Sequence, residues 1–126
     1  MRAVLDTSVL IGGLAEPIDA ELAISAVSLA ELHFGVLIAK TPQVRAARLR
    51  RVASIERAFE PLPVTDAVAR TYGALAAAVV AAGRHPRSRS LDLLIAATAA
   101  THDAVLYTCN PKDFYGLDEH LEVVAV

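Results

Sequence analysis

Apolar residues recur along this chain in two alternating patterns. Short continuous apolar runs predict buried strands, whereas apolar residues three or four positions apart predict helices. The predicted strands are Ala3–Leu5, Leu22–Val27, Ala104–Thr108 and Leu121–Val126. The predicted helices are Thr7–Leu14, Ser28–Ala39, Gln43–Phe59, Thr65 or Asp66 to Gly83, Ser90–His102 and a short one from Asn110. Strands that alternate with helices indicate an α/β fold, in which a central, mostly parallel sheet carries helices on both faces.

The composition limits the classes of protein to consider. With 126 residues, 55% of them hydrophobic, the chain is expected to form one domain, residues 1–126, with a substantial core. A net charge of −2 does not indicate general nucleic-acid binding, so phosphate affinity has to come from local basic patches. The longest apolar run, Tyr72–Ala82, is too short to span a membrane, and Met1–Leu5 already reads as a strand, so no signal peptide is expected. The single cysteine, Cys109, cannot form an internal disulfide, which favours a cytoplasmic location.

Four acidic residues stand where a strand or turn gives way to a helix: Asp6, Glu31, Asp92 and Asp113. In parallel α/β sheets, ligands bind beyond the carboxyl ends of the strands, and Asp6 and Asp113 each follow a strand there. Carboxylates that converge repel one another unless a cation lies between them. Their oxygen ligands suit Mg²⁺ or Mn²⁺. The pattern therefore predicts a divalent-metal site at this edge of the sheet.

Helix capping is the alternative explanation for each acid taken singly. Asp6 can cap the first helix, and Glu31 fits a capping box that begins at Ser28. Asp92 and Asp113 each fall in the first turn of a predicted helix, where the helix dipole favours negative charge.

Two details favour chemistry over capping. Gly35 follows Glu31 by four residues and leaves the helix face beside that carboxylate open to an ion or a phosphate. Alanines on the same face as Asp92 allow its helix to lie close to the sheet, which brings Asp92 towards Asp6.

Four segments, in order along the chain, resemble the motifs of PIN-domain ribonucleases. They are Val4–Ile11, Ile24–Leu32, Leu91–Ala99 and Leu106–Phe114. The chain length and the basic stretch Arg84–Arg89 are similar to those of VapC toxins from type II toxin–antitoxin systems. The resemblance implies a PIN-like three-layer α/β/α fold. It also implies a Mg²⁺- or Mn²⁺-dependent endoribonuclease that hydrolyses phosphodiester bonds in structured RNA such as tRNA or rRNA. Implied partners are a VapB-type antitoxin, whose tail crosses the active site, and a second copy of the chain in a homodimer.

By position, the resemblance also implies roles for individual residues. Asp6 and Asp92 are the principal metal ligands, Glu31 completes the set, and Asp113 is the fourth catalytic acid. Three further polar residues orient the ligands or the scissile phosphate: Ser8, Thr108 and Asn110. The fourth acidic position is ambiguous between Asn110 and Asp113. Asn in place of Asp6 or Asp92 is expected to abolish cleavage with little loss of folding, because it keeps the shape and removes the charge.

Contacts with RNA are expected from the stretch that leads into the Asp92 helix, through Arg84, Arg87 and Arg89. The arginines of the predicted helix 43–59 either contribute to RNA binding or form an ordinary solvated face: Arg45, Arg48 and Arg51. Tyr115 is a candidate for base stacking. The segment between Asp6 and Glu31 is short for this family, which indicates that a helix often present there is trimmed or missing.

Two rival functions remain. A phosphotransferase with Asp6 as nucleophile is disfavoured, because Ser8 stands where such enzymes carry a second Asp. A PIN-like module that binds RNA or an antitoxin without cleavage is the second rival. It gains nothing from converging carboxylates, and it should be indifferent to Mg²⁺ or Mn²⁺.

Overall fold

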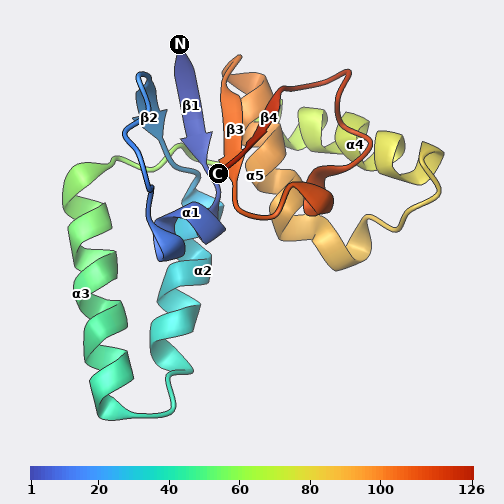
Figure 1. Ribbon diagram of the computed structural model, residues 1–126. Coiled ribbons are helices and arrows are strands. Elements are labelled where there is room, and N and C mark those ends of the chain that lie inside the picture. Colours follow the sequence, from blue (N-terminus) through green and yellow to red (C-terminus); the bar gives the residue numbers. More distant parts are fainter.

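A four-stranded sheet with helices on both faces forms the centre of the molecule (Figure 1), seen in a computed structural model that describes residues 1–126. The strands are β1 (Arg2–Leu5), β2 (Glu21–Ala23), β3 (Val105–Thr108) and β4 (Val123–Ala125). Their spatial order is β2-β1-β3-β4, and every pair is parallel. The predicted mostly parallel sheet is thus entirely parallel.

Five α-helices and two 3₁₀ turns connect the strands. The helices are α1 (Thr7–Gly12), α2 (Ala26–Leu37), α3 (Pro42–Ala58), α4 (Asp66–Ala81) and α5 (Ser90–Thr101). The 3₁₀ turns are η1 (Arg87–Arg89) and η2 (Pro111–Phe114). The longest helices begin at threonine caps: the Thr41 hydroxyl accepts the Val44 N–H at 3.1 Å, and Pro42 fits the first turn because it has no N–H to satisfy. No helix is both long enough and apolar enough to cross a bilayer.

Successive residues of each strand point to opposite faces of the sheet and build two separate cores. On one face, Val4 of β1 and Leu106 of β3 pack with α4 and α5. On the other, Leu5 and Tyr107 pack with α1, α2 and α3. β1 and β3 are therefore apolar on both sides, which explains their continuous rather than alternating hydrophobic pattern.

The chain reverses its direction of travel across the sheet between β1 and β3. From β1 it moves outward to β2, and it then returns past β1 to reach β3 and β4. Such a reversal places the carboxyl ends of β1 and β3 side by side, and the loops that follow separate to opposite faces. Asp6 and Thr108 stand at this point, because the register aligns Leu5 with Tyr107.

The structure corrects the predicted boundary between the second strand and its helix. The predicted strand Leu22–Val27 ends at Ala23, and α2 begins at Ala26 rather than at Ser28. Ser25 ends the strand because its hydroxyl accepts the Val27 N–H at 3.0 Å and caps α2. The capping box predicted between Ser28 and Glu31 is therefore wrong, since both lie inside the helix. As expected from the short segment, no further helix stands between α1 and β2.

Helices α2 and α3 form an antiparallel pair that extends away from the sheet (Figure 1). Two arginines of α3 donate to backbone carbonyls of α2: Arg48 Nη1 to Gly35 at 2.7 Å and Arg45 Nη2 to Leu37 at 3.3 Å. Arg48 is half-buried against α2 and does not fit a purely solvated face, whereas Arg45 remains exposed.

Candidate active site

Asp6 lies at the centre of the site, directly after β1, and is 4% exposed. Its carboxylate caps α1, where Oδ1 accepts the Thr7 N–H at 2.8 Å. The other oxygen, Oδ2, accepts the hydroxyls of Ser8 at 2.9 Å and Thr108 at 2.7 Å. Three donors fix the direction of the Asp6 carboxylate, and Oδ1 keeps lone-pair capacity for a further partner.

The two hydroxyls on Asp6 are themselves held by the backbone that follows β3. Ser8 Oγ accepts the Cys109 N–H at 3.0 Å, and Thr108 Oγ1 accepts the Asn110 N–H at 3.0 Å. Ser8 Oγ and Thr108 Oγ1 also lie 3.4 Å apart, but Asp6 Oδ2 is the nearer acceptor for both O–H groups. Ser8 and Thr108 thus lie where the sequence predicted orienting groups, and they orient the carboxylate of Asp6.

Glu31 is joined to the loop after β1 by a residue that sequence reasoning missed. Thr7 Oγ1 lies 2.7 Å from Glu31 Oε1 and 2.9 Å from Ser28 Oγ. An ionised carboxylate can only accept, so Thr7 donates to Glu31 and accepts from buried Ser28. Two features of the sequence could have indicated this role of Thr7. Thr7 is adjacent to Asp6, and Ser28 precedes Glu31 by three residues, a helical spacing.

Asp92 occupies the first turn of α5 and faces the other acids. Burial raises its pKa, and the charges of Asp6, Asp113 and Glu31 raise it further, to about 6 against an ordinary 3.8. The Arg89 guanidinium acts in the opposite direction but does not cancel these effects. Ala96 and Ala99 are fully buried, so the helix packs closely on the sheet, as the alanine pattern predicted. Asp92 therefore lies within electrostatic range of the other three acids.

Asp113 differs from the other acids because it has a cationic partner. Arg89 Nη1 donates to Asp113 Oδ1 at 2.5 Å and ties η1 to η2. Asn110 precedes η2 and is exposed, and its side chain makes no capping hydrogen bond. Only the Asn110 backbone N–H contacts the site, through Thr108. The short helix expected from Asn110 is thus a 3₁₀ turn that begins at Pro111 and has no side-chain cap.

The donor set suits a hard divalent cation. It consists of carboxylate and hydroxyl oxygens, which Mg²⁺ and Mn²⁺ prefer. As the side chains stand, no three of the acids converge closely enough to hold one ion. The repulsion recorded at Asp92 is nevertheless what a cation would remove, because it would replace mutual repulsion with attraction.

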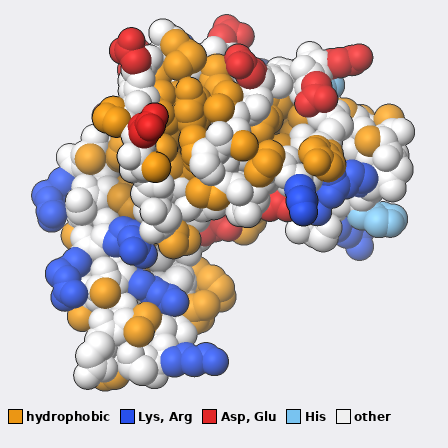
Figure 2. Space-filling view, in the orientation of Figure 1, with side chains coloured by type: hydrophobic (Ala, Val, Ile, Leu, Met, Phe, Trp, Pro, Cys, Tyr) orange, Lys and Arg blue, Asp and Glu red, His pale blue; other side chains and the backbone are white.

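The predicted RNA-binding arginines lie at the rim beside Asp113. Arg84 Nη1 donates to the Lys112 carbonyl at 3.1 Å, and its guanidinium lies 5.6 Å from the centre of the exposed Tyr115 ring. Arg87 is exposed, whereas Arg89 is held by Asp113. Figure 2 shows Lys and Arg side chains gathered in two places, over α2–α3 and over the opposite rim, with acidic side chains between them.

A family model described as PIN domain matches residues 3–119 of the chain. The chain belongs to the PIN-domain family. This PIN domain is 41% identical to ribonuclease VapC5 of Mycobacterium tuberculosis over 91% of this chain and 87% of that protein. It is 36% identical to ribonuclease VapC4 of the same organism, over 99% of this chain and 97% of that protein. A crystal structure of VapBC-5 from Mycobacterium tuberculosis, a member of the VapBC family of toxin–antitoxin systems, superposes with a TM-score of 0.87. That structure is 39% identical, and the match covers 99% of this chain and 98% of that one.

These matches confirm the resemblance on which the sequence prediction rested, and they confirm the α/β fold. They do so over nearly the whole chain, so the acidic residues of this PIN domain come from one continuous match rather than from scattered fragments.

Proposed function

We propose that this PIN domain, residues 1–126, is the toxin component of a type II toxin–antitoxin system and acts as a metal-dependent endoribonuclease. The observation that carries the proposal is the position of Asp92 within electrostatic range of Asp6, Asp113 and Glu31 at the switch point of the sheet, where burial and these three charges raise its pKa to about 6. Relatives named ribonuclease VapC support the activity. Structural neighbours that are VapBC systems support the toxin assignment.

Asp6, Glu31 and Asp92 would hold Mg²⁺ or Mn²⁺, with Asp113 as the fourth acid. When bound, the ion lowers the pKa of a water molecule and neutralises charge on the phosphate oxygens. Asp6 is held by the hydroxyls of Ser8 and Thr108, and Glu31 by that of Thr7, so the protein itself sets the direction of these carboxylates. Between Asn110 and Asp113, the proximity of Asp113 to Asp92 favours Asp113 as the fourth group.

The proposed substrate is structured RNA such as tRNA or rRNA, and the proposed compartment is the cytoplasm. Arg84 and Arg87 lie at the rim of the acidic site, where a guanidinium can bind phosphate in bidentate fashion. Tyr115 beside Arg84 offers an aromatic face for an unpaired base. Arg89 joins them only after it leaves Asp113.

The proposed protein partners are a VapB-type antitoxin and a second copy of the chain. Apolar side chains at the C-terminal end of α2 and at its C-cap are exposed to solvent, at 63% for Phe34, 72% for Leu37 and 55% for Ile38. Exposed apolar residues grouped in this way are typical of protein interfaces. The solved neighbours include VapBC complexes, which supports an antitoxin as the partner.

A binding module without catalysis is the second candidate, and the Arg89–Asp113 ion pair favours it. An arginine on the fourth acid neutralises charge without a metal. In that case Mg²⁺ should change neither RNA binding nor stability.

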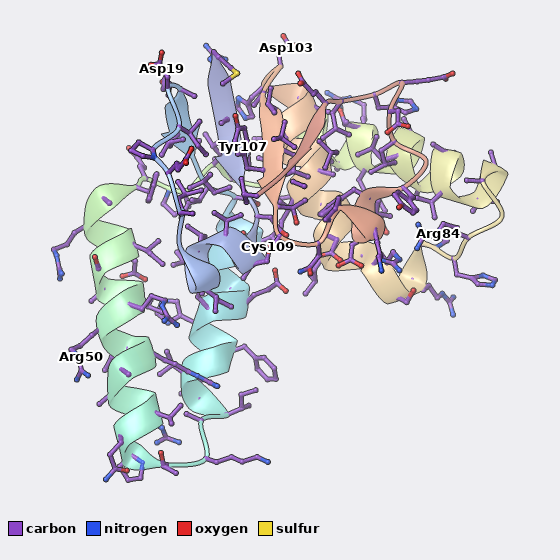
Figure 3. All side chains as sticks on the ribbon, in the orientation of Figure 1. Asp19, Arg50, Arg84, Asp103, Tyr107 and Cys109 are labelled. Carbon is purple, nitrogen blue, oxygen red and sulfur yellow. The ribbon has the colours of Figure 1, made fainter.

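Incubation of total cellular RNA with the purified protein tests the proposal. Discrete fragments are expected with Mg²⁺ or Mn²⁺ and none with EDTA or with Asp6→Asn. Asp103→Asn is the matched control, because Asp103 is exposed at the opposite end of the sheet from Cys109 and the site (Figure 3). Its activity should equal that of the wild type. Cleavage by Asp6→Asn at the wild-type rate would contradict the assignment.

A further inference from the structure

A cavity of about 280 Å³ opens beside Glu31, between the end of α1 and the facing sides of α2 and α3. Glu31 forms one wall, so the cavity adjoins the proposed metal site directly. On the α2 side Gly35 also lines the cavity, and on the α3 side Arg48 and Arg51 line it. Nothing lies within 4 Å of the position that a Cβ on Gly35 would take, so the glycine leaves this space open.

The cavity carries positive charge that the protein does not neutralise. Its charged lining is Glu31 with Arg48 and Arg51, one acid against two bases. The structure contains two ion pairs, His33–Glu56 and Arg89–Asp113, and neither involves these arginines. Arg48 uses one nitrogen on the Gly35 carbonyl at 2.7 Å, which fixes its orientation and leaves its other N–H groups free.

We propose that this cavity binds a backbone phosphate of the RNA strand next to the phosphate that is cleaved. The inference rests on the proposed nuclease function and adds a subsite to it. A planar guanidinium pair in an open pocket matches the oxygens of a phosphodiester. The apolar wall formed by Leu32 and Val52 suits the carbon face of a ribose. RNA would then be held on both sides of the acids, by Arg48 and Arg51 on one side and by Arg84 and Arg87 on the other.

The position of Glu31 favours RNA over a protein carboxylate as the occupant. One side of this residue faces Thr7 and the proposed metal site, and the other faces the cavity. Glu31 is thus shared by the acidic site and the cavity, so a strand whose scissile phosphate lies at the acids has the cavity next to it. The arginines also offset the repulsion between Glu31 and that strand.

Binding of a fluorescein-labelled single-stranded oligoribonucleotide in EDTA, measured at several salt concentrations, tests the subsite without requiring cleavage. Arg51→Gln should weaken binding about five- to tenfold and reduce the slope of log Kd against log salt by about 0.7. Arg50→Gln is the matched control, because Arg50 points away from α2 on the same helix (Figure 3) and does not line the cavity. Arg50→Gln should change both the Kd and the salt slope by less than Arg51→Gln does.

Gly35→Leu fills the cavity without altering charge and should weaken RNA binding like Arg51→Gln. Its melting temperature should not fall, since the added side chain enters open space and leucine favours helix more than glycine does. Equal effects of Arg50→Gln and Arg51→Gln, or unchanged binding by Gly35→Leu, overturn the subsite. If Arg51→Gln loses binding of an oligoglutamate peptide but binds RNA like the wild type, the cavity is a site for a protein ligand and the RNA subsite is overturned. Metal-dependent cleavage is scored separately, so a wild type that binds RNA here but cleaves nothing removes the nuclease proposal and leaves the subsite.

Discussion

The two sides of the acidic site are built on different physical principles. Asp6 and Glu31, from the N-terminal part of the chain, are held by neutral hydroxyl and N–H donors at 2.7–2.9 Å. Asp92 and Asp113, from the C-terminal part, are governed by charge: one has a raised pKa and the other an arginine partner. The first side is therefore organised before any ion arrives, whereas the second changes when charge is added or removed.

This contrast separates the structural and chemical roles of similar carboxylates. Hydrogen bonds from hydroxyls stabilise the ionised form and fix its direction, so removal of the acid leaves donors unpaired. Repulsion among partly buried carboxylates has the opposite sign, so removal of one acid relieves an unfavourable interaction in the folded state. Four experiments test this difference between the two sides of the site.

The largest effect is expected on cleavage, and it should be the same on both sides. Asp6→Asn and Asp92→Asn each remove a charged ligand, and each should reduce the cleavage rate by about 10³-fold. Single-turnover cleavage of a defined RNA at saturating Mg²⁺ measures it, with Asp103→Asn as the control. If a variant recovers most of its activity at higher Mg²⁺, the substitution has lowered the affinity for the metal and not the rate of the chemical step.

The same two variants should differ in the sign of their effect on folding. Asp6→Asn leaves at least one hydroxyl donor on a poor acceptor, and the free energy of unfolding should fall by about 1–2 kcal/mol. The sequence alone led to the prediction of little loss of folding for this change, and the measured free energy of unfolding decides between the two predictions. Asp92→Asn should raise the free energy of unfolding at pH 7.5 by about 1–2 kcal/mol, a figure reduced to allow for solvent screening.

Urea unfolding as a function of pH checks that sign. The folded pKa of Asp92, about 6, lies above the unfolded value of 3.8, so the folded state binds more protons between those limits. Stability from this group is greatest below about pH 4 and declines as the pH rises to about 6. The gain from Asp92→Asn should therefore vanish at pH 4, and an equal gain at both pH values rules out relief of charge.

A smaller effect is expected from Mg²⁺ alone. An ion that binds the folded state stabilises it by about 2.7 kcal/mol at a concentration 100 times its Kd. The rise in melting temperature should be greater at pH 7.5 than at pH 5, because protons compete for Asp92 at the lower pH. Asp92→Asn should lose most of the rise, and Asp103→Asn none of it. No shift in the wild type at any pH supports the non-catalytic module.

The smallest effect concerns the ion pair on the C-terminal side. Arg89 lowers the pKa of Asp92, so Arg89→Gln should move that pKa upward, followed by the carboxyl ¹³C resonance during titration. Arg87→Gln is the matched control, since Arg87 lies in the same 3₁₀ turn, is exposed and is not among the groups that shift Asp92. A downward shift in Arg89→Gln would show that Arg89 acts mainly by burying Asp92.

Local pattern was sufficient for the order of strands and helices and for the positions of the four acids. The apolar runs at β1 and β3 are continuous because both faces of each strand are buried, and such runs are easy to recognise. The end of β2 was misplaced because Ser25 and the bridge from Ser25 to Leu62 divert the chain, and neither has a local apolar signature. The role of Thr7 was missed for the same reason, since its partners lie 21 and 24 residues away.

The sequence by itself determined the α/β class, the membership of the PIN-domain family and the identity of the acidic residues, because each depends on residue types at regular or short spacings. Only the tertiary structure decided which acids are held by hydroxyls and which by charge, that Arg89 is occupied by Asp113, and that Arg48 and Arg51 line a cavity beside Glu31. These are contacts between elements far apart in the chain, and their energies depend on burial and distance, which the order of residues does not specify.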